Sequence, residues 1–214
     1  MMHKDSVSRM VTKRVRQARQ RFFEPNDFGA PAAVVDRVLS RLASRDELIR
    51  VRRGLYWRGP RSLLGMTPPA TSQVLTYLLK GMSYGPSSYS AANVLGLTSQ
   101  VPARTVIAVS GRPPRDLNSL AVRFAERGGK RGLNRQRLNA NEIAVLEVLE
   151  SWDDLVEIDA DDAWRRLRSL IDSGSVRADA LAVAARTEPK IVRSGLERLG
   201  VTGTIGHDMV AATS

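Results

Sequence analysis

The chain has 214 residues, 43% of them hydrophobic and 26% charged, which is the composition of a globular protein long enough to bury a core. Because it has no cysteine, disulfides, thiolate metal sites and cysteine nucleophiles are excluded. No stretch approaches the ~18 consecutive apolar residues of a membrane span, and the basic N-terminal segment lacks the apolar core of a signal peptide, so we expect a cytoplasmic protein.

Three helices are expected before residue 45. Apolar side chains recur at helical spacing from Val7 to Ala18, while Arg14 and other basic residues occupy the remaining face. Residues 24–27 favour a turn and a brief second helix that ends at Gly29. Pro31 opens the third helix, because proline loses no hydrogen bond in a first turn. The apolar stripe of this helix is Val35, Val38, Leu39 and Leu42, and its outer face is Ala33, Arg37, Ser40, Arg41 and Ser44.

A β-hairpin is expected next. The strand-like runs 48–52 and 55–57 are joined through Arg53 and Gly54. Three helices followed by a hairpin within about sixty residues is the order of a winged helix-turn-helix, which places one helix in the DNA major groove. Tyr56 and Trp57 could stack on bases, but on the return strand of a hairpin we expect them in the core. Residues 1–65 are therefore predicted to be a DNA-binding domain.

The third helix and the hairpin supply most of the candidate DNA contacts. The small side chain of Ala33 permits close approach, and Arg37 and Arg41 can reach guanine edges or phosphates. The arginines of the hairpin are expected to reach the DNA backbone or the minor groove. The candidate DNA-binding residues are Arg14, Ala33, Arg37, Ser40, Arg41, Arg50, Arg52 and Arg53.

Residues 66–214 are expected to form a second domain, after a boundary near residues 58–68. Helices at 74–79 and within 84–98, strands at 105–109 and 120–124, and a turn at 111–115 predict a mixed α/β part up to about residue 138. Residues 139–200 are expected to be helical, and 201–214 a flexible tail. The helical hairpin at 181–199 resembles a helix-turn-helix, but its acidic surroundings favour plain helix packing. The predicted fold class is α+β.

Charge is distributed unevenly along the chain. Residues 1–60 hold 14 Lys and Arg against 6 Asp and Glu, and residues 61–140 hold 11 against 2. Residues 141–214 reverse the sign, with 8 against 14. A basic body with an acidic end indicates that one region neutralises phosphates and another does not. The alternative is a set of ordinary solvated arginines.

Three patterns that could indicate an enzyme fail on their spacing. The carboxylates between Asp153 and Asp162 do not follow the calcium-loop order, so we expect a solvated or helix-capping cluster. The glycine-rich segment 128–132 lacks the earlier glycine of a phosphate loop, and a basic turn is expected. The serines at 87, 88 and 90 lack a nucleophile elbow, and His3 and His207 lie near the termini. We expect no catalytic residue, cofactor or metal.

Two N-terminal segments carry a family resemblance. The run from Asp36 to Leu42 (DRVLSRL), followed by LIRVRRGLY at residues 48–56, resembles the winged helix of AbiEi-type antitoxins. Segments 95–102 and 138–142 are similar to the second domain of that family, so the resemblance extends over about residues 7–200. It implies a non-enzymatic antitoxin that represses its own promoter through the N-terminal domain. It also implies that the C-terminal domain neutralises a nucleotidyltransferase-like toxin encoded by a neighbouring gene, either by direct contact or indirectly.

Other functions stay open at the level of sequence. One is a stand-alone winged-helix regulator whose C-terminal region senses a ligand or partner. Another is RNA binding by the basic middle region, but Tyr77, Tyr84 and Tyr89 are few for the aromatic stacking that RNA recognition uses. A nucleotidyltransferase-like neighbouring gene would favour the antitoxin, and a metabolic operon would favour the regulator.

Overall fold

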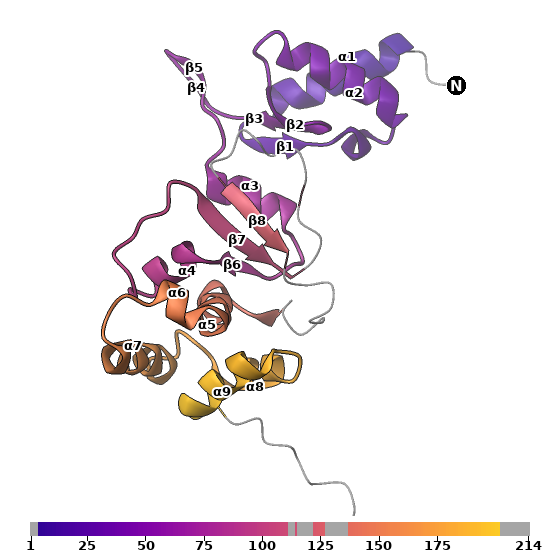
Figure 1. The fold of residues 1–214 in the computed structure, drawn as a ribbon. Helices are drawn as coiled ribbons and strands as arrows, with labels where there is room; N and C mark the ends of the chain where they lie inside the picture. The colour runs from indigo at the N-terminus through magenta and orange to yellow at the C-terminus, as the bar shows by residue number, and fades with distance from the viewer. Residues whose placement is uncertain (1–3, 111–113, 115–121, 127–136, 202–214) are drawn as a thin grey trace, which may run out of the picture. The chain divides into compact units, whose positions relative to one another are not determined.

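The computed structural model describes residues 4–110, 114, 122–126 and 137–201, drawn as a coloured ribbon in Figure 1. These residues combine helices with small sheets, which confirms the α+β class. They form two compact units, one up to Leu78 and the other from Leu79 onward. None of the helices in these ranges is long and apolar enough to cross a membrane. The expected turns at 111–113 and 128–132, the tail after Val201, His3 and His207 lie outside the described residues.

The first unit begins with the expected helices. Helix α1 spans Lys4–Gln17, a short 3-10 helix η1 spans Pro25–Phe28, and α2 spans Ala32–Ala43. The expected hairpin is formed by β2 (Ile49–Arg52) and β3 (Leu55–Arg58). A strand that the sequence did not predict, β1 (Arg21–Phe23), pairs with β3, so that the antiparallel sheet has the order β1-β3-β2.

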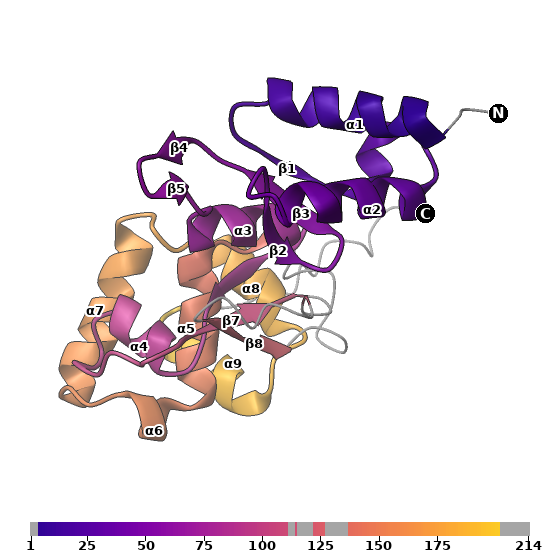
Figure 2. The same cartoon turned by 90° about the horizontal axis from the view of Figure 1, so that it is seen from above.

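One core joins these elements. Helices α1 and α2 lie against each other, as Figure 2 shows. Their apolar stripes are covered by Phe23, Phe28 and Tyr56. Tyr56 is completely buried and Trp57 is 3% exposed, which confirms that both aromatics belong to the interior of the unit. The members of this core are Val7, Val11, Val15, Phe23, Phe28, Val35, Val38, Leu39, Leu42, Leu48 and Tyr56.

A second, smaller hairpin follows the sheet. Its strands are β4 (Arg61–Ser62) and β5 (Gly65–Met66), and α3 (Thr71–Leu78) completes the first unit. Phe22 links α3 to the sheet, because its ring centroid lies 4.6 Å from those of both Trp57 and Tyr77. Helix α3 therefore belongs with the first compact unit, and the domain division between residues 65 and 66 stays a prediction.

The second unit combines a three-stranded sheet with six helices in its described residues. Strand β7 (Thr105–Val109) is central, with β6 (Tyr84–Pro86) antiparallel and β8 (Val122–Glu126) parallel to it. The expected small-residue helix is α4 (Tyr89–Val94). The helical region after residue 139 is confirmed as α5 (Ala140–Glu150), α6 (Trp152–Leu155), α7 (Ala160–Asp172), α8 (Ala178–Ala185) and α9 (Lys190–Arg198).

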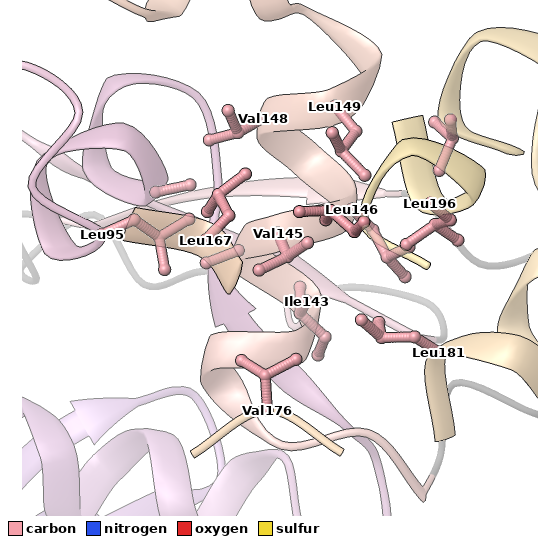
Figure 3. Packing of buried hydrophobic residues seen from close by; sticks show 14 of the residues in the cluster. Leu95, Ile143, Val145, Leu146, Val148, Leu149, Leu167, Val176, Leu181 and Leu196 are labelled. Carbon is pink, nitrogen blue, oxygen red and sulfur yellow. The ribbon is translucent and has the colours of Figure 1, made fainter. Parts of the chain in front are cut away.

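Helix α5 lies at the centre of this unit. Every residue from Glu142 to Leu149 is buried, and Figure 3 shows Leu95, Leu167, Leu181 and Leu196 gathered around it. Because α5 contacts β6, α4 and α9, the mixed α/β part and the helical part share a single core. Gly195 lets α9 lie close to α5, since an added Cβ would lie 2.7 Å from Leu149 Cδ2.

Candidate nucleic-acid interface

Helix α2 has one buried face and one exposed face. Val35, Val38, Leu39 and Leu42 are at most 4% exposed, which confirms the predicted stripe. On the other side Ala33, Arg37 and Arg41 are exposed, and Ser40 is half-buried. Residues four apart lie above one another on a helix, so Ala33, Arg37 and Arg41 form one line along the surface. A small residue followed by two guanidinium groups is a surface that can approach a polyanion closely.

The Tyr56 hydroxyl fixes α2 to the sheet. It donates a hydrogen bond to Asp36 Oδ1 at 2.8 Å, and Asp36 directly precedes Arg37. Burial and the Asp36 carboxylate raise the pKa of Tyr56 to about 12, against smaller opposing effects of Arg50 and of a hydrogen bond with Ser40. The phenol therefore stays protonated and donating throughout the neutral range. Sequence reasoning missed this contact, which no periodic pattern contains.

The β2–β3 hairpin presents three candidate arginines in different environments. Arg50 and Arg53 are exposed, and Arg53 stands beside Gly54, whose φ of 73° suits glycine at the turn. The strand register shifts between Arg50 and Arg52, which is a local irregularity of the ladder. Arg52 is half-buried, and its Nε is buried without a hydrogen-bond partner among the described residues. Arg50 and Arg53 are thus the more accessible cations of the hairpin.

Arg14 is exposed, but it also makes contacts within the first unit. Its Nη1 donates to the carbonyl oxygen of Asp27 at 2.7 Å, and its guanidinium carbon lies 5.2 Å from the centroid of the Phe28 ring. These contacts attach α1 to η1. A DNA contact by Arg14 stays a prediction, and it would have to coexist with them.

Two arginines outside the predicted set hold the segment between α2 and β2. Arg16 binds Glu47 with both Nε and Nη2, at 2.8 and 3.1 Å, and the pKa of Glu47 is lowered chiefly by this hydrogen bond. Arg58 Nη1 donates to the Glu47 carbonyl oxygen at 3.0 Å. The segment that separates the candidate helix from the candidate hairpin is therefore held from two sides.

The enzyme-like patterns have structural explanations where the chain is described. Asp159 caps α7 by accepting from the amides of Asp161 and Asp162, which confirms the expected capping role. Ser87 Oγ donates to the buried Glu147 carboxylate at 2.5 Å, and Ser90 Oγ accepts from the Val106 amide. No group of three or more potential metal-ligating side chains gathers within the described ranges.

A shallow groove of about 600 Å³ lies on α7 and α9 of the second unit. The guanidinium carbon of Arg198 lies 4.6 Å from the centroid of Trp164, which in turn stacks on Trp152 at 4.1 Å. Arg168 Nη2 donates to the Arg198 carbonyl oxygen at 3.2 Å. The groove is thus lined by an indole, by arginines that already have partners within the unit, and by the carboxylates of Asp161 and Asp172.

Comparison with known proteins gives little similarity. No family model matches the chain, and no curated protein matches it significantly. Among solved structures, the chain is similar to the RV2827C protein from Mycobacterium tuberculosis, at 14% sequence identity and a TM-score of 0.46. The similarity covers 92% of this chain and 77% of the other.

Proposed function

We propose that the first unit binds double-stranded DNA as a winged helix-turn-helix, with α2 as the recognition helix and the β2–β3 hairpin as the wing. The observation that carries the proposal is the exposed line of Ala33, Arg37 and Arg41 on α2, opposite a fully buried stripe. A helix of this kind can enter a major groove, where arginine pairs with the O6 and N7 atoms of guanine. Ser40 borders this line, and the exposed Arg50 and Arg53 lie on the neighbouring hairpin.

The charge of the chain supports the same proposal. The excess of basic residues in residues 1–60 gives the first unit the sign that phosphate binding requires. Arg37, Arg41, Arg50 and Arg53 are all exposed, so their charges are available to a polyanion. Arg14 and Arg52 are assigned a supporting role, because each is also engaged within the fold or partly buried.

The test is a mobility-shift assay of the full chain with a duplex from its own promoter. Arg37→Ala with Arg41→Ala should cost about 1–3 kcal/mol of binding at each base that is read, and much less on a scrambled duplex. The matched control is Arg104→Ala with Arg186→Ala, which removes the same charge from exposed positions of the second unit. If the two double variants lose equal affinity, or if the Arg37 and Arg41 variant loses equal affinity on the promoter and scrambled duplexes, α2 is not the recognition helix.

For the whole chain we propose the AbiEi-type function, an antitoxin that represses its own operon and neutralises a nucleotidyltransferase-like toxin. The motif resemblance and the reversal of charge after residue 140 support it. In this proposal the second unit is responsible for neutralising the toxin, either by direct contact with the toxin or indirectly. Growth of cells that co-express the chain with the neighbouring gene product is the test, and failure of rescue by the folded wild-type chain would contradict it.

A second candidate is a stand-alone regulator that senses a small ligand. The groove on α7 and α9 favours it, because an indole that lies between arginines and the carboxylates of Asp161 and Asp172 can hold a flat molecule that carries both an anionic and a cationic group. A compound that raises the Tm of the wild type, but not of Trp164→Ala, and that changes DNA affinity would support this function. A chain that rescues growth and shows no such response would support the antitoxin.

A further inference from the structure

The β4–β5 hairpin ends in two completely exposed leucines. Leu63 and Leu64 are 106% and 101% exposed, as open to solvent as side chains in an extended peptide. Single exposed leucines are ordinary, but two adjacent ones at the tip of a projecting hairpin place apolar area where only a partner can cover it. Figure 1 shows β4 and β5 as a narrow arm that leaves the sheet of the first unit.

The arm is closed by hydrogen bonds at its tip. Arg61 pairs with Met66 and Ser62 with Gly65 in an antiparallel register. The Leu64 amide donates to Ser62 Oγ at 3.2 Å, and Ser62 Oγ donates to the Gly65 carbonyl oxygen at 3.1 Å. Gly65 has a φ of 111°, which an L side chain would strain. The leucines are therefore presented in a defined turn.

The base of the arm is attached to the sheet. The Thr67 amide donates to the Pro60 carbonyl oxygen at 2.9 Å, and Trp57 Nε1 donates to the Thr67 carbonyl oxygen at 3.0 Å. Gly59 passes beneath this contact, where an added Cβ would lie 2.4 Å from the Thr67 oxygen. Arg61 Nη2 reaches the Asp46 carbonyl oxygen at 3.0 Å, just beyond the end of α2. The orientation of the arm is thus coupled to the buried Trp57 and to the segment after α2.

The charge around the arm favours a nucleic acid over a protein as the partner. The segment from Arg50 to Arg61, which leads into the arm, contains five arginines, of which Arg50, Arg53 and Arg61 are exposed. Between Glu47 and Asp116 the chain has no Asp or Glu at all. Duplex DNA presents phosphates to such cations and apolar base faces to leucine, so it satisfies both features of the surface.

We propose that the β4–β5 arm enters the DNA minor groove and that Leu63 and Leu64 act as an apolar wedge between base pairs, bending the duplex. This inference rests on the proposed DNA binding of the first unit and adds a second contact beyond α2 and the β2–β3 wing. Aliphatic wedges partly unstack a base step and kink the duplex toward the major groove. The arm accordingly selects sites with deformable steps such as TA, without reading base edges.

The experiment measures DNA bending by the full chain. The probe is a promoter duplex of about 30 bp, labelled with a fluorescence donor and acceptor at its ends, with a TA step near its centre. Leu63→Ser with Leu64→Ser removes the wedge and no charge, and it leaves the fold intact because neither side chain is buried. The control is Val94→Ser with Val101→Ser, which removes exposed apolar side chains (61% and 80% exposed) from the second unit.

The wild type and the valine control should bend the duplex, whereas the double leucine variant should not, and its affinity should fall roughly tenfold. Its slope of affinity against salt should stay unchanged, because every cation that faces a phosphate is retained. A wild type that binds without bending, or a leucine variant that bends normally, overturns the wedge and leaves the proposed DNA binding standing. If the wild type self-associates in sedimentation and the leucine variant, although it bends DNA, does not, the arm is assigned to protein contact. A wild type that binds no duplex overturns both proposals.

Discussion

The hydroxyl of Tyr56 donates to Asp36 across 2.8 Å, and this bond connects the central strand of the first sheet to the residue before Arg37. The orientation of the exposed line on α2 therefore depends on a buried phenol of β3. The buried Tyr56 side chain is not proposed to contact DNA, but it positions the residues of α2 that are.

Replacing Tyr56 with Phe should lower the free energy of unfolding by about 0.5–1.5 kcal/mol, because Asp36 loses its donor while the ring remains packed. Affinity for promoter DNA should fall more than affinity for scrambled DNA, because the position of α2 is relaxed. Urea denaturation and mobility-shift assays measure the two effects. In a double-mutant cycle with Asp36→Ala, which removes the acceptor, additive losses would show that the two side chains are not coupled.

Alkaline pH should weaken the first unit through Tyr56. The pKa of about 12 in the folded state is higher than the ordinary 10.0, so the folded chain holds this proton more tightly than the unfolded chain. Its stabilising contribution is complete below pH 10 and is lost as the pH rises toward 12. Denaturant titrations at several pH values should show this loss in the wild type and a smaller one in Tyr56→Phe. Identical curves for the two proteins would place the alkaline effect elsewhere.

The sequence predicts elements whose side chains repeat along one face. The stripe of α2 and the helices after residue 139 follow from spacing alone, because 3.6-residue periodicity is a local property. Strands β1 and β6 have three residues each, too few for an alternation to be recognised. Leu63 and Leu64 show a further limit of prediction from sequence. Hydropathy assigns leucine to the core, but the turn of the β4–β5 hairpin places both side chains in solvent.

The candidate site was predictable to a similar degree. Helical spacing places Ala33, Arg37 and Arg41 on one exposed face, as the structure has them, although their contact with DNA stays a prediction. The contact between Tyr56 and Asp36 joins residues twenty positions apart, so no local pattern contains it. Glu142 is buried, although hydropathy places glutamate at the surface. The Asn-x-x-Glu spacing from Asn139 is a capping signature that could have indicated the hydrogen bonds between Glu142 and Asn139.

Acid should weaken the second unit through Glu142. Burial by itself would raise the pKa of this carboxyl, but hydrogen bonds from the Arg177 side chain and from the amides of Asn139 and Arg177 lower it below the ordinary 4.5. The stabilising contribution is present above pH 4.5 and is lost as the pH falls through the lowered value. Arg177→Gln should reduce this loss of stability in acid and should also lower the free energy of unfolding at neutral pH, because the buried Glu142 carboxylate loses its cationic partner.

Arg186→Gln is the matched control for that measurement, because Arg186 is exposed on the same unit. It should leave both the neutral stability and the acid limb unchanged. Circular dichroism against urea concentration, repeated from neutral pH to pH 3, provides the comparison. Equal acid sensitivity of Arg177→Gln and the wild type would assign the effect to another carboxyl.

Replacing Arg50, Arg52 and Arg53 with Ala should weaken DNA binding almost equally on promoter and scrambled duplexes, because wing arginines that bind phosphates position the protein without reading bases. The slope of log affinity against log salt should fall by about 1 for each phosphate that is no longer neutralised. If the proposed antitoxin function is correct, rescue of growth by this variant, expressed from an independent promoter, should persist.

A second variant limits the change to Arg50→Ala with Arg53→Ala and spares the half-buried Arg52. Circular dichroism establishes that both variants are folded. Normal DNA binding by the folded triple variant would show that the wing assignment is wrong. Failure of the same folded variant to rescue growth would show that the two functions share a surface.

The burial of residues 142–149 of α5 determines how the second unit can open to solvent. Helix α5 cannot detach singly, since its departure would expose residues of β6, α4 and α9 together. The backbone amides of residues 143–149 should therefore exchange hydrogen for deuterium only through unfolding of the entire unit, while those of α8 exchange through smaller openings. Their exchange rate is a direct reading of the global stability of that unit inside the intact chain.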